Sequence, residues 1–376
     1  MSVSFVTRYY DRARGGLGRY EQALYPHLKR EVGAQLATIQ PIRVPRLAAK
    51  AGLAVGRDLC AVATNYPCVV PITRHYDGVV HLANQTMGLS LYLRRSGRWV
   101  VTVHDIFPYI QLVTGEYGGL RGISPWNSIL YRLSIRGLRR ADQIIADSEH
   151  TKHDLQRYAG VPPERVDVVP LGVDLNIFRT VAVPDSFRDT YGLRSDRRYL
   201  LYVGSQDIRK NLPTLFTAVE QLRRQLPDVR LLIVGAARLR PDTKTDVGLE
   251  NGDPHDPSVR LLGHLPEDDL VKLYCISQAL VFPSVYEGFG LPVLEAMACG
   301  CPVIAAQATS LPEVVGDAGW LVEPLNPDSW IQAISTVLED RNTRLRLIEA
   351  GLSRAQCFPW ENTASQTVAV YKRLGA

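Results

Sequence analysis

Short apolar runs alternate with stretches of helical periodicity along nearly the whole chain. The runs are rich in Val, Ile and Leu and are apolar almost throughout, as strands covered on both faces should be. Alternation of this kind predicts βαβ units with right-handed crossovers, and therefore parallel sheets. We expect strands at residues 2–6, 79–82, 99–103, 143–146, 166–169, 199–203, 230–234, 259–262, 279–282 and 303–305. We expect helices at residues 18–31, 125–139, 149–158, 212–225, 267–277, 292–299, 328–339, 343–357 and 363–374.

The chain divides into two series of such elements. Its 376 residues are enough for about two domains at ~150 residues each. The segment before the strand at Tyr199 carries a proline and little periodicity, so we place a linker at about residues 178–196. Residues 1–180 and 181–360 are therefore expected to form two doubly wound α/β domains. Residues 238–257, rich in Asp, Gly and Pro, are expected to form a surface loop.

Composition narrows the class of protein. Apolar residues make up 46% and charged residues 22%, which excludes a disordered or fibrous chain. The net charge of +5 is too small to indicate a nucleic-acid-binding protein. The charge is uneven, because residues 1–180 hold 23 Lys and Arg against 14 Asp and Glu, whereas the remainder holds 20 against 24. A basic half joined to a slightly acidic half suggests that the two domains face different partners.

Targeting signals and cysteine spacing favour a cytoplasmic protein. The first residues show no basic flank, apolar stretch and cleavage site of the kind that marks a signal peptide. No run of ~18 apolar residues is present, so we expect no membrane span. The six cysteines form no Cys-x-x-Cys and no zinc-type cluster with His, so we expect free thiols in a reducing compartment.

The strongest motif runs from Glu287 to Glu295, after the strand at residues 279–282. Gly288 and Gly290 allow a sharp turn and close approach to a ligand, and Pro292 suits the first turn of a helix. Free N–H groups at a helix start bind anions. A ligand that lies across this start could meet both carboxylates, while its phosphate takes the N–H groups. The alternative is a solvated glutamate and a plain turn.

The second motif spans residues 204–211 and follows the first strand of the second half. Ligands of open parallel sheets bind beyond the carboxyl ends of the strands. Arg209 and Lys210 would neutralise a diphosphate there, Arg as a planar fork and Lys as a point charge. The alternative is a helix-entry loop with exposed cations.

The third motif, at residues 14–20, follows the first strand of the first half. It is not Gly-x-Gly-x-x-Gly, and no acidic residue ends a second strand to hold a ribose, which argues against a nicotinamide-dependent dehydrogenase. The two adjacent glycines, Gly15 and Gly16, offer close backbone approach to a ligand. A purely structural turn is the alternative.

His104 ends the strand at residues 99–103 and is the fourth candidate. We expect a histidine at the carboxyl end of a strand to face a cleft, whereas a core histidine usually lies within an element. We find no Ser/His/Asp arrangement, no P-loop and no Asp-x-Asp metal pair, so no metal site is expected.

Basic residues follow a helical spacing in the first half. They are Arg132, Arg136, Arg139 and Arg140, with Arg43, Arg46, Lys50 and Arg57 further upstream. Acidic headgroups or a phosphorylated acceptor would suit such a surface. A solvated helix face is the alternative.

Several segments together resemble the family 4 retaining glycosyltransferases, and specifically mannosyl-type transferases of glycan assembly in bacteria and archaea. The resemblance covers essentially the whole chain. It rests on VFPSVYEGFGLPVLEAMACGCPVIA, GSQDIRKN, GGLGRY, ADQIIADSEHTKHDL, VVPLGVD and FPWENTASQTVAVY.

The resemblance implies the GT-B fold, in which two Rossmann-like domains face each other across a cleft. The C-terminal domain would hold a nucleotide-sugar donor and the basic N-terminal domain the acceptor. Residues 361–376 would form the family's terminal helix, which packs back on the first domain. The resemblance also implies transfer with retention, with no metal and no cofactor besides the nucleotide-sugar co-substrate.

Roles carry over from the family to matching positions. Glu287 matches the carboxylate that contacts sugar hydroxyls, and Glu295 matches the one that accepts from the ribose. Lys210, with Arg209 beside it, matches the diphosphate clamp, and His104 matches the histidine near the donor sugar. The donor-lining positions implied in the same way are Gly15, Gly16, Gly204, Ser205, Gly263, His264, Leu265, Gly288, Phe289, Gly290, Leu291 and Glu295.

Two features depart from the family pattern. Some members carry Arg where Ser205 follows Gly204, so one phosphate cation is missing here and Arg209 takes more of that role. Residues 238–257 are irregular where many members have a helix, which leaves the contacts to the base open.

We therefore expect a hexosyltransferase that acts on a glycan, glycolipid or related acceptor. The run from His104 to Pro108 is similar to members that use GDP-mannose, while UDP- and dTDP-sugars stay open. The basic N-terminal domain favours peripheral contact with the inner face of the cell membrane. The alternatives are a nucleotide-sugar epimerase of the same fold and a catalytically inactive nucleotide-sugar-binding subunit. A phosphorylase would need a cofactor-binding lysine, for which no segment argues.

Overall fold

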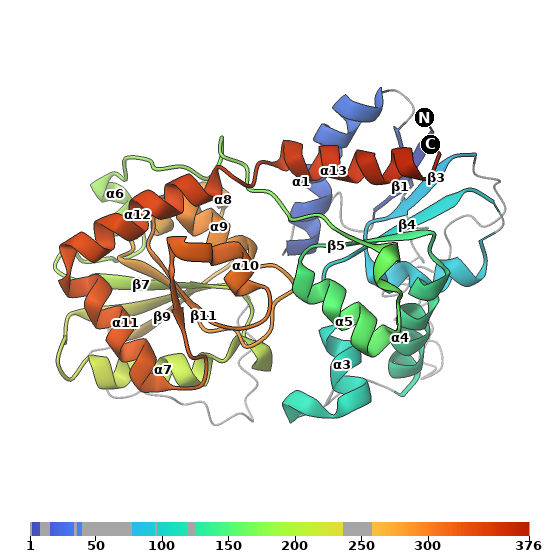
Figure 1. Ribbon diagram of the computed structural model, residues 1–376. Helices are drawn as coiled ribbons and strands as arrows, with labels where there is room; N and C mark the ends of the chain where they lie inside the picture. Colours follow the sequence, from blue (N-terminus) through green and yellow to red (C-terminus); the bar gives the residue numbers. More distant parts are fainter. Residues whose placement is uncertain are drawn as a thin grey trace, which may run out of the picture. The chain divides into compact units, whose positions relative to one another are not determined.

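The computed structural model describes residues 2–7, 16–33, 36–39, 77–94, 96–118, 125–235 and 258–375 (Figure 1). The chain divides into two units, Met1–Gly172 with Trp360–Ala376, and Val173–Pro359. The sequence placed this division near residue 180. It lies earlier because the Val173 N–H already donates to the Phe358 carbonyl, at 2.8 Å, within the second unit.

The first unit is built on a parallel sheet of six described strands in the order β2-β1-β3-β4-β5-β6. They are β1 (Val3–Val6), β2 (Leu36–Ile39), β3 (Val79–Leu82), β4 (Arg98–Val103), β5 (Gln143–Ala146) and β6 (Val166–Val168). Four of them, β1, β3, β4 and β5, are mostly buried, as their apolar composition predicts.

Helices flank this sheet, and each has a local reason to begin or end where it does. Ser148 caps α5 by accepting from the Thr151 N–H at 3.1 Å, and Gly160 ends that helix in the left-handed conformation. The described helices and 3₁₀ turns are α1 (Gly16–Val32), η3 (Gln85–Tyr92), α3 (Phe107–Thr114), η4 (Glu116–Gly118), α4 (Pro125–Gly137), η5 (Leu138–Arg140), α5 (Glu149–Ala159), η6 (Pro163–Arg165) and α13 (Trp360–Arg373).

Helix α13 closes the chain and packs on α1 in the first unit (Figure 1). The predicted stripe of Ala364, Val368 and Tyr371 is buried. The Thr363 hydroxyl donates to the Pro170 carbonyl at 2.8 Å and fixes the start of the helix.

The second unit is a parallel sheet in the order β12-β11-β10-β7-β8-β9. Its strands are β7 (Arg198–Val203), β8 (Val229–Val234), β9 (Val259–Gly263), β10 (Ala279–Phe282), β11 (Val303–Ala306) and β12 (Trp320–Val322). Helices α7 (Leu212–Leu222) and α11 (Pro327–Glu339) pack together on one face, whereas α8 (Glu267–Ile276), α9 (Leu291–Ala298) and α12 (Arg341–Ala355) cover the other (Figure 1). The remaining elements are α6 (Asp185–Thr190), η7 (Ile208–Lys210), α10 (Leu311–Val315) and η8 (Gly316–Ala318).

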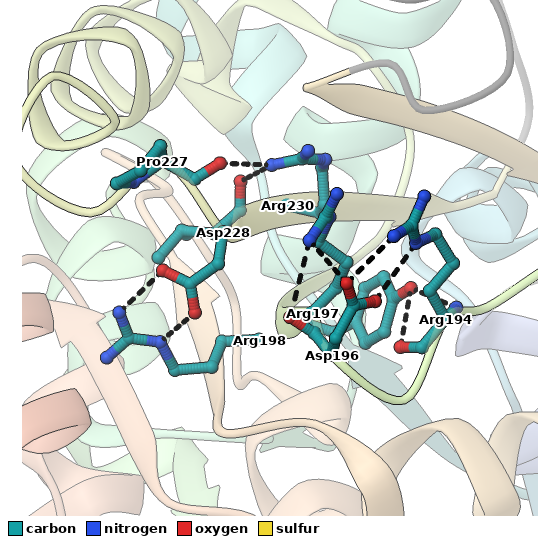
Figure 2. Close-up of polar contacts among 9 residues, drawn as sticks. Arg194, Asp196, Arg197, Arg198, Pro227, Asp228 and Arg230 are labelled. Carbon is teal, nitrogen blue, oxygen red and sulfur yellow. Dashed lines mark hydrogen bonds and ion pairs between the residues drawn. The ribbon is translucent and has the colours of Figure 1, made fainter.

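Arginine–aspartate pairs anchor the amino ends of β7 and β8, as Figure 2 shows. Arg198 makes two parallel hydrogen bonds to Asp228, at 2.6 and 2.7 Å. Arg194 and Arg197 both bind Asp196. Because the strands are parallel, this cluster lies at the opposite end of β7 from Lys210 and takes no part in the site below.

Some elements differ from the sequence prediction. Two edge strands, β2 and β12, and the helices α3, α6 and α10 were not predicted, because runs of three to eight residues carry little periodicity. Helix α6 lies inside the predicted linker and buries Phe187. The predicted surface loop at residues 238–257 lies outside the described residues.

Candidate active site

The strand order of the second unit reverses between β7 and β10. Strands β8 and β9 extend the sheet on one side of β7, and the next strand, β10, pairs with β7 on its other side. Ligands of open α/β sheets bind beyond the carboxyl ends of the strands at such a point. The loop after β7 carries Arg209 and Lys210, and the loop after β10 carries Glu287. Two motifs found separately in the sequence thus meet at one place.

Lys210 and Glu287 form an ion pair through the lysine Nζ and the glutamate Oε1. Only 9% of the lysine side chain and 10% of the glutamate side chain are exposed. The Nζ also lies 5.3 Å from the centre of the Phe282 ring, and the two groups form a cation–π contact. The alternative of an exposed cation on a helix-entry loop is therefore wrong for Lys210.

Glu287 is ionised in this pair. Burial alone would raise the pKa of its carboxyl group, but the charges of Lys210 and Arg209 and the hydrogen bond from Lys210 outweigh it. The pKa of Glu287 is therefore held below its usual range.

Backbone contacts fix the loop that carries Lys210. The Val285 N–H donates to the Arg209 carbonyl at 2.8 Å, which joins the loops after β7 and β10. Asn211 takes a left-handed conformation, with φ of 50°, and its side-chain amide donates to the Pro324 carbonyl at 2.7 Å. This turn ends η7 at Lys210 and lets α7 begin at Leu212.

Two hydroxyl side chains after β11 fix the loop that carries Glu287. The Glu287 N–H donates to Thr309 Oγ1 at 3.0 Å. The Ser310 hydroxyl lies within hydrogen-bond distance of two carbonyls, those of Glu287 at 3.0 Å and Phe289 at 2.9 Å. Sequence reasoning named neither residue, and their only signal is a pair of small polar residues just beyond a parallel strand.

Helix α9 begins directly after this loop, at Leu291. Gly290 has φ of +120°, and a Cβ atom there would lie 2.9 Å from Leu311 Cδ2, so this position requires glycine. Pro292 lies in the first turn, and no side chain of the described residues caps the helix. The start of α9 therefore has the features of an anion-binding helix end.

Glu295 lies on α9 and is only 2% exposed. The Tyr274 hydroxyl, from α8, donates to its Oε2 at 2.9 Å. The alternative of a solvated Glu295 is therefore wrong. The two carboxylates of the motif have different partners, a lysine for Glu287 and a tyrosine for Glu295.

The other predicted donor positions of this unit lie at the same carboxyl edge. The Tyr202 hydroxyl donates to the Ser205 carbonyl at 2.6 Å, and the Ser205 hydroxyl donates to Asp207 Oδ2, also at 2.6 Å. A Cβ atom on Gly204 would lie 2.7 Å from the Tyr202 hydroxyl, which explains the glycine. Of the last predicted positions, Gly263 ends the edge strand β9, and His264 and Leu265 follow it, with His264 exposed.

In the first unit, His104 follows β4 as predicted, and both ring nitrogens of its mostly buried imidazole have partners. Nδ1 lies 2.6 Å from Asp147 Oδ2, and Nε2 lies 3.0 Å from the Ala83 carbonyl oxygen. These two partners follow β5 and β3, the strands on either side of β4, and they hold the ring in place. The prediction from strand position missed these neighbours.

The remaining predictions for the first unit have mixed outcomes. Gly16 begins α1, whereas Gly15 lies outside the described residues. Arg132, Arg136, Arg139 and Arg140 are exposed on α4 and η5. The upstream cations Arg43, Arg46, Lys50 and Arg57 lie outside the described residues.

Comparison with known proteins identifies the family. Residues 184–354 match the model for glycosyl transferases group 1, and residues 40–177 match that for glycosyltransferase family 4. O-antigen chain mannosyltransferase B of Escherichia coli is 34% identical over 289 residues, which cover 76% of this chain and 74% of that protein. The chain is a family 4 glycosyltransferase.

Other matches agree with this assignment. The D-inositol 3-phosphate glycosyltransferase of a Nocardioides species is 32% identical over 316 residues, which cover 80% of this chain and 68% of the relative. Sucrose-phosphate synthase from Thermosynechococcus elongatus superposes with a TM-score of 0.73 at 22% identity, over 100% of this chain and 99% of the other. Anabaena HepE, solved in complex with UDP and glucose, gives 0.71 at 19% identity, over 99% and 100%. These two structures show that the glycosyltransferase has the GT-B fold.

The described part of the glycosyltransferase contains no helix with the length and apolar character needed to cross a membrane.

Proposed function

We propose that this glycosyltransferase moves a hexose from a nucleoside diphosphate sugar to a glycan, glycolipid or related acceptor, with retention of configuration and without a metal. The observation that carries the proposal is the buried Lys210–Glu287 pair at the point where the strand order of the second unit reverses. A lysine so deeply buried needs a counter-charge. Glu287 supplies one, and a bound diphosphate would supply a second.

The proposed donor site assigns a part to each group. Lys210 and Arg209 neutralise the diphosphate, helped by the backbone N–H groups at the start of α9. Glu287 accepts from sugar hydroxyls with the oxygen that does not contact Lys210, and Glu295 accepts from the ribose while Tyr274 orients it. The backbone from Gly288 to Leu291 lines the donor.

The chemistry follows from where charge develops. The bond between the anomeric carbon and the diphosphate oxygen breaks, and its electron pair leaves with the diphosphate. The acceptor hydroxyl oxygen forms the new bond on the same face, and its proton leaves with the diphosphate product. Fixed cations and N–H groups aimed at the leaving oxygen stabilise this transition state, and removal of one such donor commonly costs ~3 kcal/mol.

We favour a mannose-type donor and a glycan acceptor. The relative with 34% identity is named as an O-antigen chain mannosyltransferase. The sequence from His104 to Pro108 is similar to family members that use GDP-mannose. The epimerase and the inactive subunit are less well supported, because the named relatives are transferases and the charged residues of the motifs are all present.

We also propose a cytoplasmic enzyme that touches the inner face of the membrane through its first unit. Exposed Arg132, Arg136 and Arg140 lie near Ile129 and Leu133, which are 47% and 37% exposed. A mixed basic and apolar surface of this kind suits anionic headgroups.

A thermal-shift series with GDP, UDP, dTDP and ADP tests the donor site. The preferred diphosphate should raise the melting temperature, since ligand at a hundredfold excess over Kd adds ~2.7 kcal/mol of stability. The gain should disappear in Lys210→Met and remain in Lys272→Ala, which removes a partly exposed lysine paired with Asp269 in the same unit. Equal shifts in both variants would contradict the assignment.

A further inference from the structure

Three neighbouring strands bring His104 and Asp147 together in the first unit. Val103 and Ala146 are register partners in β4 and β5, so the next residues, His104 and Asp147, leave the sheet side by side. Ala83 follows β3 on the other side of β4. The carboxyl ends of three parallel strands thus converge on one imidazole, and only 10% of its side chain is exposed.

The two acceptors determine where the protons lie. The Ala83 oxygen is a carbonyl and can only accept, so Nε2 carries a hydrogen and donates it at 3.0 Å. Nδ1 faces Asp147 Oδ2 at 2.6 Å. When Asp147 is ionised, Nδ1 donates as well, and the ring is an imidazolium whose nitrogens are both occupied. A ring held this way has no lone pair with which to take a proton from a substrate.

Asp147 has few other partners in the described part of the chain. Its carboxylate is 2% exposed, and Oδ1 is buried without a hydrogen-bond partner among the described residues. A buried carboxylate needs a counter-charge. Burial raises the pKa of the Asp147 carboxyl, and the charge of His104 and its hydrogen bond oppose that rise, so His104 is the group that favours the ionised carboxylate.

The surroundings favour the positive charge on the ring. Burial alone would lower the pKa of His104, but Asp147, the Ala83 carbonyl and Asp105 outweigh it and raise that pKa above its usual value. From α1, the Tyr20 ring packs edge-on against the imidazole, with 4.6 Å between the ring centres. Glu21, the next residue of α1, is also buried. From β3, His81 stays neutral because burial and the charge on His104 lower its pKa to about 3.

The loop that carries His104 is fixed as firmly as the ring. The Gln85 side chain accepts from the His104 N–H at 3.3 Å and donates to the Asp105 carbonyl at 2.7 Å. The positive charge therefore has a set position at the carboxyl end of the sheet, where ligands of α/β units bind.

We propose that Asp147 is a positioning residue of this glycosyltransferase, which holds the His104 ring in place and in its positively charged form near pH 7. His104 then acts through that charge, and not as a proton acceptor. The effect on turnover rests on the transfer reaction proposed above, whereas the charge on His104 does not.

The test uses Asp147→Asn, which keeps the shape of the side chain and removes its charge. ¹⁵N-histidine NMR of the whole enzyme reports the charge directly, with the His104 signals assigned by their loss in His104→Gln. We expect both ring nitrogens protonated in the wild type near pH 7, and a neutral ring in Asp147→Asn, where burial prevails. A neutral His104 ring in the wild type would overturn the proposal, even if Asp147→Asn failed to fold.

The pH dependence of transfer gives a second readout that a merely structural role would not move. Activity should be lost as pH rises through the pKa of His104, so the alkaline limb should shift to lower pH by about one unit or more in Asp147→Asn. Asp154→Asn is the matched control, because Asp154 pairs with His150 at 3.3 Å on α5 of the same unit. A uniform loss of rate with an unchanged limb would contradict the proposal. If the wild-type enzyme transferred no sugar, the proposed function would be refuted. The NMR experiment would still show whether the His104 ring is charged.

Discussion

Lys210 and Glu287, 77 residues apart in the chain, form a buried ion pair where the strand order of the second unit reverses. Each comes from the loop after a different strand, and the two loops are joined by the hydrogen bond from the Val285 N–H to the Arg209 carbonyl. The pair is therefore a product of topology, and it places a cation and a carboxylate where a sheet of this order binds its ligand.

The buried pair makes a prediction about stability. Lys210→Met and Glu287→Gln should each cost about 3–5 kcal/mol of unfolding free energy, because each leaves one charge buried without its partner. The double variant should cost less than the sum of the two single variants. Urea denaturation of all four proteins measures this difference. Additive losses would mean that the two side chains do not interact.

Tyr274 should matter for donor binding through Glu295. Tyr274→Phe removes the hydroxyl that donates to the Glu295 carboxylate, so we expect a loss of about 1–3 kcal/mol in stability and a higher KM for the donor. Tyr199→Phe is the matched control. The Tyr199 hydroxyl accepts from the Arg194 N–H at 2.7 Å, at the end of β7 opposite to the candidate site. Steady-state kinetics should show an unchanged donor KM in the control. Equal KM values in the two variants would contradict the role given to Tyr274.

His81 should make the protein less stable in acid. Burial, with the charge on His104, lowers the pKa of His81 to about 3, whereas an unfolded histidine titrates near 6.5. Below pH ~6.5 His81 binds a proton in the unfolded chain but stays neutral in the folded chain. The free energy of unfolding therefore falls as pH decreases from ~6.5 toward 3. His81→Gln, which cannot titrate, should remove this contribution. Between pH ~7 and ~5 the wild type should lose about 2 kcal/mol more than the variant. Parallel pH dependences in denaturation experiments would show that His81 does not titrate this way.

The basic surface on α4 should bind anionic membranes. Arg132→Glu with Arg136→Glu should weaken binding to vesicles of phosphatidylglycerol and phosphatidylcholine at least tenfold, since each basic residue contributes ~1 kcal/mol near such a surface. Arg341→Glu with Arg346→Glu makes the same charge change on α12 of the second unit and should have little effect. Vesicle co-sedimentation distinguishes the two. Equal binding by both double variants would argue that α4 does not face the membrane.

The inner strands of both sheets were predictable because they are mostly buried and therefore read as apolar runs. The edge strands β2 and β12 were missed, since three or four residues show no pattern above that of a loop. Helix α13 was predicted from the spacing of Ala364, Val368 and Tyr371, and all three are buried against the first unit.

The candidate site was predictable where its residues lie in motifs on the loops that follow parallel strands, as Lys210 and Glu287 do. Their supporting residues were not predicted, because the roles of Thr309, Ser310 and Tyr274 depend on contacts that only the folded chain makes. The same limit explains His104, whose position at a strand end was correct and whose orientation depends on Asp147, a neighbour 43 residues away.

The rate of sugar transfer from the donor whose nucleotide binds best tests the central claim most directly. It should be measured for the wild type, for the double variant Lys210→Met with Glu287→Gln, and for Lys272→Ala. If the diphosphate and the sugar are held by this pair, the double variant should transfer at least ~100-fold more slowly while it still unfolds cooperatively, and Lys272→Ala should match the wild type. A folded double variant that transfers sugar at the wild-type rate would contradict the account.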